Sequence, residues 1–289
     1  MELRSVAALI EASRKMPIWE AILCSDLEED TPEQRVASLE KMRMLWQVMQ
    51  DSAAGYDGSQ RSLSGLSGGD GEKYTQMMSS GKMMCGTYLN DAIATALKVS
   101  ECNACMKRIV AAPTAGSCGV IPAVLIPYRK EYPDTPEEEM LHALYVTGGF
   151  GNIIAERASV SGAEAGCQAE IGAASAMAAA ALVYLRGGSP EACGNACAMA
   201  LKNLLGLVCD PVAGLVEVPC VKRNVVGVVN AISCANMALA GIVSRIPPDE
   251  VIDAMAEVGS SMSVDLRETA RGGLAATPTG KRIAAERAE

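Results

Sequence analysis

The chain has 289 residues, a formal net charge of −9 at pH 7 and 3% aromatic residues. This length is enough for one large domain, with or without a small annex, that buries a substantial core. The negative charge argues against a nucleic-acid partner and against an anionic membrane surface, because both select clustered Lys and Arg. No signal-like segment is recognised, and the Ala-rich run 173–185 is too short to span a bilayer. We therefore expect a soluble, cytoplasmic protein with no membrane partner that acts on a small molecule or binds a protein partner.

Helix-start patterns recur along the chain: Thr31-Pro32-Glu33-Gln34, Thr135-Pro136-Glu137-Glu138 and Ser189-Pro190-Glu191. Each combines a capping side chain with a first-turn proline. Helical spacing of apolar residues follows over 36–49 and over 192–205, and Gly206 is the expected end of the second of these helices. Alternating runs of β-branched and aromatic residues are lacking. We predict an all-α, compact multi-helix domain in which strands are a minority at most.

Small residues dominate the second half, which fits helices that approach one another closely. Glycine-rich segments separate the predicted helices, at residues 64–74, 113–119, 160–172, 208–224 and 271–280. Loops between rigid helices are where binding sites are usually built. We therefore expect these glycine-rich loops to form the site.

Eleven cysteines and a single histidine limit the possible chemistry. The odd cysteine count, without a secretory signal, favours reduced thiols or metal ligands over a disulfide framework. His142 lies within a helical pattern and is interpreted as structural. Most metal-dependent hydrolase designs, which need several imidazoles, are excluded.

Local sequence sorts the cysteines into two groups. Cys193, Cys197 and Cys234 lie in apolar helical segments and are predicted to be small core residues. Cys102 and Cys105 form a single C-x-x-C spacing in a helical segment, so a structural role is favoured over a redox or metal-binding one.

Cys167, Cys209 and Cys220 each stand beside Gly, Pro or a charged residue in a loop-like segment. Thiols among loop N–H groups can be held as thiolates and can bind an iron–sulfur cluster. Three ligands in place of four would leave one iron with an open position, as a Lewis-acid metal enzyme requires.

Four longer stretches carry a family resemblance: "AAPTAGSCGVIPA", "GAEAGCQAEIGAASAMAAAAL", "LGLVCDPVAGLVEVPCVKRN" and "LRETARGGLAATPTG". They resemble the iron–sulfur-dependent L-serine dehydratases, also called L-serine deaminases, in their α subunit or α domain. The resemblance covers essentially residues 1–289, and it implies a helical part of about 1–60 packed on a cluster-binding core. It further implies conversion of L-serine to pyruvate and ammonia without pyridoxal phosphate. The resemblance also implies that Cys167, Cys209 and Cys220 bind the oxygen-sensitive [4Fe-4S] cluster of the family.

Two departures from the family pattern matter. The family also has a β portion with a Ser-Ser-His-Thr-like motif, which this sequence lacks, so the resemblance implies a separate β subunit. Some single-chain relatives extend to a C-terminal cysteine that can reach the cluster, whereas this sequence ends "RIAAERAE". We therefore expect the fourth iron to be open to substrate or water.

Elimination of the serine hydroxyl needs an acid at the hydroxyl and a base at the α-carbon. The leading candidates for the base in this chain are Lys73 and Asp70, and Lys222 and Glu170 are further candidates. A group of the β subunit is at least as good a candidate for the base.

Hydroxyls and backbone N–H groups of the turn 113–119 form a nest suited to an anion. We expect Thr114, Ala115, Gly116 and Ser117 to hold the substrate carboxylate. Polar contacts to the amino group or hydroxyl are expected from "SGGD", which is Ser67, Gly68, Gly69 and Asp70, and from Asn224. The alternative is that these segments are tight turns between packed helices. Cys118 is expected to be a packed thiol.

Three other functions remain open at this stage. Cysteine desulfidase-type β-elimination could run on the same scaffold, because a soft thiol binds iron readily. Pyridoxal-phosphate chemistry would use Lys73 as the Schiff base and the glycines beside it as the phosphate cup. A non-catalytic helical partner subunit would use its cysteines only for packing.

Overall fold

The computed structural model describes residues 3–287, which form thirteen α-helices linked by short 3₁₀ and π turns. Within this described part of the chain there is no β-strand, only an isolated bridge between Cys209 and Arg267. The prediction of an all-α domain is confirmed.

The α-helices have the following bounds: α1 Val6–Ala12, α2 Ile18–Asp26, α3 Pro32–Ala54, α4 Asp70–Met78, α5 Thr87–Ala104, α6 Val120–Glu131, α7 Glu137–Arg157, α8 Gly162–Ala165, α9 Ala173–Leu185, α10 Pro190–Asn203, α11 Cys220–Leu239, α12 Pro248–Ser261 and α13 Pro278–Glu286.

Two of the three predicted helix starts are confirmed. The Thr31 side chain accepts a hydrogen bond from the Gln34 N–H at the start of α3, and the Ser189 side chain accepts one from the Ala192 N–H at the start of α10. The prediction at Thr135 is wrong, because α7 begins at Glu137 and Pro136 is its cap residue. Three consecutive glutamates in the first turn of α7 face the positive end of the helix dipole instead.

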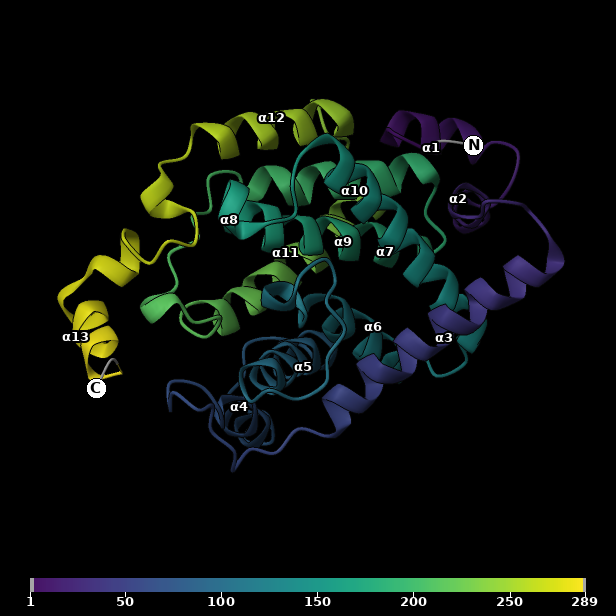
Figure 1. Cartoon of the computed structure of the whole chain (residues 1–289). Coiled ribbons are helices and arrows are strands. Elements are labelled where there is room, and N and C mark those ends of the chain that lie inside the picture. The colour runs from purple at the N-terminus through teal and green to yellow at the C-terminus, as the bar shows by residue number, and fades with distance from the viewer. Residues whose placement is uncertain (1–2, 288–289) are drawn as a thin grey trace.

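Helix α9 forms the centre of the core. It packs against α6, α7, α10 and α11 (Figure 1). Every residue from 173 to 183 is buried, and most of them are alanines, which lets the neighbouring helices approach closely. Cys193, Cys197 and Cys234 are buried around it, as predicted for core residues. One helical stretch, Gln168–Leu185, is long and apolar enough to cross a membrane, but 83% of it is buried inside the fold.

The N-terminal helices lie on the side of the molecule opposite to α13 (Figure 1). Helix α2 packs on α7, α3 packs on α7, α5 and α6, and α1 packs on α2, α10 and α12. Gly149 of α7 is needed there, because a Cβ atom would lie 2.5 Å from the Ile22 side chain of α2. His142 is buried in α7, and its ring stacks on Trp19 with 3.7 Å between the ring centroids. This packing agrees with a structural role for the histidine.

Candidate metal centre and substrate site

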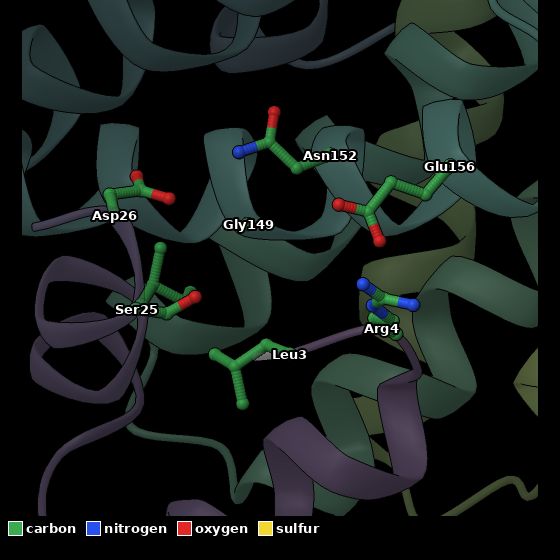
Figure 2. Close-up of a pocket in the computed structure, with 8 residues that line it drawn as sticks. Leu3, Arg4, Ser25, Asp26, Gly149, Asn152 and Glu156 are labelled. Carbon is green, nitrogen blue, oxygen red and sulfur yellow. The ribbon is translucent and has the colours of Figure 1, made fainter. Parts of the chain in front are cut away.

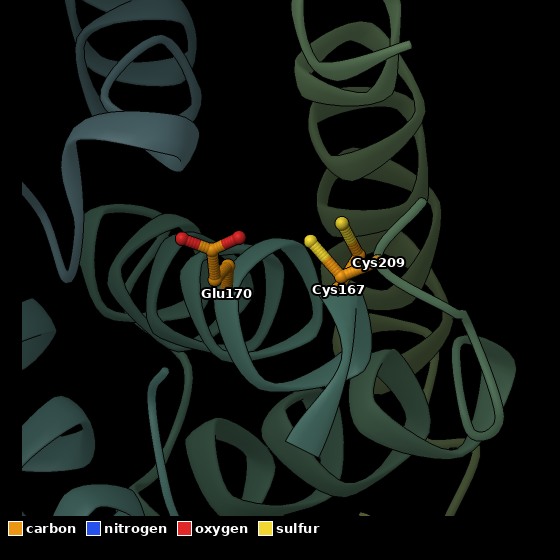
Figure 3. A group of neighbouring side chains, drawn as sticks. All are labelled: Cys167, Glu170 and Cys209. Carbon is orange, nitrogen blue, oxygen red and sulfur yellow. The ribbon is translucent and has the colours of Figure 1, made fainter. Parts of the chain in front are cut away.

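Two buried thiols and a carboxylate form one compact group (Figure 3). Cys167 and Glu170 come from the π turn that leads into α9, and Cys209 comes from the loop after α10. The ligand atoms of these three residues all lie within 4.8 Å of one another. π turns inside helical segments often occur at functional sites. This one places a thiol and a carboxylate on the same side of the chain.

Glycines leave the space that this group occupies. A Cβ atom on Gly162 would lie 2.6 Å from Glu170 Oε2 and 3.1 Å from Cys209 Sγ. Gly166, directly before Cys167, has φ of +75° and would place a Cβ 2.7 Å from the Met262 sulfur. A larger residue at either position would fill the cradle or strain the backbone.

Arg223 supplies the positive charge beside the thiols. Its Nη1 donates to Cys167 Sγ at 3.3 Å and to the Val208 carbonyl at 2.7 Å, and its Nη2 donates to Asp210 at 2.8 Å. The hydrogen bond from the Cys209 thiol, together with the Arg223 guanidinium, lowers the pKa of Cys167. Donation of that bond and burial raise the pKa of Cys209. Cys167 is therefore the first of the pair to become a thiolate.

Cys220 is the first residue of α11 and lies outside the 4.8 Å group. Burial raises the pKa of its thiol to about 12, with further contributions from the charges of Cys167 and Glu170. The third predicted thiol therefore shares an electrostatic environment with the other two. A metal that binds all three must displace their protons.

The segment after α12 holds the Cys209 loop in place. The Cys209 N–H donates to the Leu266 carbonyl, and the Glu268 N–H donates to the Cys209 carbonyl, both at 2.8 Å. The Leu274 N–H donates to the Asp210 carboxylate at 2.8 Å. The stretch "LRETARGGLAATPTG" is therefore hydrogen-bonded to the loop that carries the Cys209 thiol.

The turn predicted to bind a carboxylate adjoins the same group. Thr114 Oγ1 donates to Glu170 Oε1 at 2.7 Å, and a Cβ on Gly116 would lie 3.1 Å from that oxygen. Ser117 is fully buried, and its hydroxyl lies close to the Thr114 N–H and hydroxyl. Ala115 begins the 3₁₀ turn. Thr114 and Gly116 therefore face the carboxylate beside the thiols.

Asn224 connects this turn to α11. Its Oδ1 accepts a hydrogen bond from the Gly119 N–H at 2.9 Å. Its Nδ2 donates to the Gly116 carbonyl at 2.8 Å and to the Cys220 carbonyl at 3.0 Å. The amide group, predicted from the sequence to contact substrate, is bonded at both ends to the main chain.

Residues 67–73 contact the first turn of α11 through Asp70 and Lys222. Asp70 accepts from Lys222 Nζ at 2.5 Å and from Lys73 Nζ at 3.0 Å. Gly69 has φ of +83° and directly precedes α4, and Ser67 is buried. Asp70 and Lys73, nominated for the acid–base role, are thus an ion pair that also includes Lys222.

The N–H groups of this loop already bind a carboxylate. Those of Gly68, Asp70 and Gly71 donate to Glu101 at 3.2, 2.9 and 3.2 Å, and the Tyr56 hydroxyl donates to it at 2.6 Å. Glu101 is 1% exposed. A phosphate could use these N–H groups only by displacing Glu101, which weakens the pyridoxal-phosphate alternative.

Three partners of the site were not identified from the sequence: Glu101, Asp210 and Arg223. Glu170 was only one of four candidates for the base. Its place three residues after Cys167 was the available signal, but its contact with Thr114 depends on the tertiary fold.

A separate polar hollow of about 180 Å³ lies between α2, α7 and the residues before α1 (Figure 2). Asp26, Asn152 and Glu156 turn their polar ends toward it. Burial raises the pKa of Asp26. None of the residues that line this hollow was predicted to bind substrate or metal.

Comparison of the sequence with known proteins identifies the family of the chain. The family model "Serine dehydratase alpha chain" matches residues 13–275. A protein of Bacillus subtilis named "Probable L-serine dehydratase, alpha chain" is 54% identical over 222 residues, 77% of this chain and 74% of that protein. "L-serine dehydratase, alpha chain" of Peptoniphilus asaccharolyticus is 50% identical over 204 residues, 71% of this chain and 70% of that protein.

A longer relative matches over only part of its length. "L-serine dehydratase TdcG" of Escherichia coli is 48% identical over 181 residues, which make up 62% of this chain but 40% of that protein. Since the family model spans most of the chain, the chain belongs to the serine dehydratase alpha chain family.

Proposed function

We propose that this chain is the α subunit of an L-serine ammonia-lyase. It eliminates the β-hydroxyl of L-serine to give pyruvate and ammonia, uses a [4Fe-4S] cluster instead of pyridoxal phosphate, and works with a separate β subunit. The observation that carries the proposal is the group of two buried thiols, Cys167 and Cys209, and the half-buried Glu170 carboxylate beside Arg223. The names of the relatives supply the substrate.

The donor set suits a thiolate-bound cluster held by Cys167, Cys209 and Cys220. Two thiols are adjacent, and the third thiol, at the start of α11, shares their electrostatic environment. The absence of a side chain at Gly162 leaves room for the Cys209 thiol and the Glu170 carboxylate. Arg223 favours the thiolate that a metal requires. When bound, the cluster would supply an iron that acts as a Lewis acid toward the serine hydroxyl.

Glu170 is our candidate for the base that accepts the α-proton of serine. Burial raises the pKa of its carboxyl, and the hydrogen bond from Thr114 fixes its orientation. A carboxylate with a raised pKa is a stronger base, provided that it is ionised at the working pH. Asp70 and Lys73, which are bonded to each other and through Asp70 to Lys222, stay a second proposal for the acid–base role.

The substrate carboxylate is proposed to bind at the turn of Thr114, Ala115, Gly116 and Ser117. Asn224 would hold this turn against α11 instead of touching the substrate, because its amide is bonded to main-chain atoms. Ser67, Gly68 and Gly69 would form the opposite wall, supported by Glu101.

The proposal is tested by anaerobic co-purification with a family β subunit and by measurement of pyruvate released from L-serine. We expect turnover that requires the β subunit and that is lost in air. L-Cysteine as a parallel substrate separates hydroxyl elimination from thiol elimination. Turnover of L-cysteine without turnover of L-serine would contradict the assignment, and so would an imine on Lys73 that borohydride traps.

A further inference from the structure

The serine–glycine loop, defined here as residues 62–71, lies between α3 and α5 and includes the start of α4. It contains Ser67, Gly68 and Gly69, which are proposed to form one wall of the substrate site. Glu101 of α5 binds the N–H groups at the far end of the loop. A second buried glutamate, Glu217, holds the near end.

Glu217 binds the loop through two serine hydroxyls. Its carboxylate accepts from Ser62 Oγ at 2.6 Å, and Ser64 Oγ lies 2.8 Å from both of its oxygens. Glu217 is only 6% exposed. Hydrogen bonds to a buried charged group are about twice as strong as neutral ones, so the loop is held firmly at this point.

The same serines close the loop on itself. The Ser67 N–H donates to Ser62 Oγ at 3.2 Å, and the Ser62 N–H donates to the Ser67 carbonyl at 3.0 Å. The Leu66 N–H donates to Ser64 Oγ at 2.9 Å. The hydrogen bonds that Ser62 and Ser64 donate to Glu217 therefore fix the conformation of residues 62–67 as well as their position.

The main chain of Glu217 lies in the turn that leads into α11. Glu217 lies three residues before Cys220, and its carbonyl accepts the Val221 N–H at 3.0 Å. A single residue thus links the serine–glycine loop to the helix end that carries a thiol proposed to bind the cluster. Lys222 adds a second link from the same helix turn to Asp70.

We infer that Glu217 is a positioning residue that fixes the serine–glycine loop against the Cys220 end of α11, and so sets the affinity for substrate. This inference rests on the proposed function. Glu217 does not belong to the donor set, so its removal should leave metal binding intact. Loss of the hydrogen bonds between Glu217 and the loop should weaken substrate binding and largely preserve the chemical step. KM should therefore rise more than kcat falls.

The test compares Glu217→Ala and Glu217→Gln with Ser59→Ala in the αβ enzyme. Ser59 is a serine near the same loop whose hydroxyl binds Asp57, so it serves as the matched control. We expect Glu217→Ala to raise KM for L-serine about tenfold, which corresponds to about 1.4 kcal/mol of binding free energy. Hydrogen exchange of the Ser62, Leu66 and Ser67 amides should become about tenfold faster, with unchanged iron per chain. Glu217→Gln should be intermediate, because its amide oxygen still accepts a hydroxyl.

Unchanged exchange and unchanged KM in Glu217→Ala would overturn the inference. Loss of iron without faster loop exchange would also overturn it, because the residue would then support the thiols and not the loop. If Glu217→Ala does not fold, Ser64→Ala removes one of the two hydroxyl contacts from the loop side, and the same changes are expected at a smaller size because the Ser62 contact remains. A wild-type enzyme without turnover would refute the proposed function, while the exchange data would still decide whether Glu217 holds the loop.

Discussion

Glu170 combines three features at the scale of a single residue: partial burial, a hydroxyl partner and two neighbouring thiols. Its folded-state pKa is raised above the ordinary value for glutamate. The folded chain therefore holds this proton more tightly than the unfolded chain does. The resulting stability is present below the ordinary pKa and is lost as the pH rises through the folded-state pKa.

Glu170→Gln should consequently have opposite effects on activity and stability. Pyruvate formation should fall by about 100-fold or more, because a general base contributes at least that factor. The metal-free variant should melt at a higher temperature than the metal-free wild type at pH 8, and the gap should narrow toward pH 4. Steady-state kinetics and thermal unfolding at the two pH values test both effects.

Glu257→Gln, at an exposed position of α12, is the control for the loss of one negative charge. Retention of more than a tenth of the wild-type turnover by Glu170→Gln would remove Glu170 from the role of base.

The sequence was informative about residues whose immediate neighbours are distinctive. Gly, Pro and charges beside Cys167, Cys209 and Cys220 separated them from Cys193 and Cys234, which are core residues in the structure. Partners from distant segments left no such local signature. Arg223 reaches a thiol 56 positions away, and this contact follows from how α9 and α11 pack.

At the scale of elements, helix content followed from caps and apolar spacing, whereas helix ends depended on tertiary contacts. The predicted helix over 192–205 ends at Asn203, and Gly206 adopts φ of +80° beyond it. The Gly206 N–H is bonded to the Gln168 side chain at 2.9 Å, so the π turn beside the thiols fixes this glycine. Such a contact is not visible in the local sequence.

Two adjacent glycines of α7 test the account of helix packing. Gly149→Ala should destabilise the chain, because its Cβ would overlap the Ile22 side chain, whereas a Cβ on Gly148 meets no atom within 4 Å. Gly148→Ala should stabilise the helix by up to about 1 kcal/mol. Overpacking at Gly149 typically costs about 1–3 kcal/mol. We therefore expect the free energies of unfolding of the two variants to differ by about 1–4 kcal/mol.

Urea unfolding of the metal-free chain measures this difference. Equal stabilities of Gly148→Ala and Gly149→Ala would show that α2 is not packed on α7 as described.

At the scale of the whole molecule, the first turn of α11 is the point where distant segments meet. Lys222 contacts the residue that begins α4, Arg223 contacts Cys167 and the Cys209 loop, and Asn224 holds the turn after Pro113. The sequence predicted that the glycine-rich segments would build a site, but not that this single turn would connect them. That connection arises from side chains that reach across more than 100 residues, as Asn224 does to Gly116.

The lengths of the relatives bear on assembly. Only 40% of the Escherichia coli protein matches this chain, while 74% of the Bacillus subtilis α chain does. This difference supports the proposal that a further portion, supplied here by a β subunit, completes the active enzyme.

The most direct measurement of the central claim is the iron and acid-labile sulfide content of the anaerobically reconstituted chain. We predict about four irons and four sulfides per chain in the wild type. Cys167→Ser, Cys209→Ser and Cys220→Ser should each lose the cluster, whereas Cys105→Ser and Cys234→Ser should keep it. A wild-type chain without iron, or a cluster that survives all three ligand substitutions, would contradict the assignment of these cysteines.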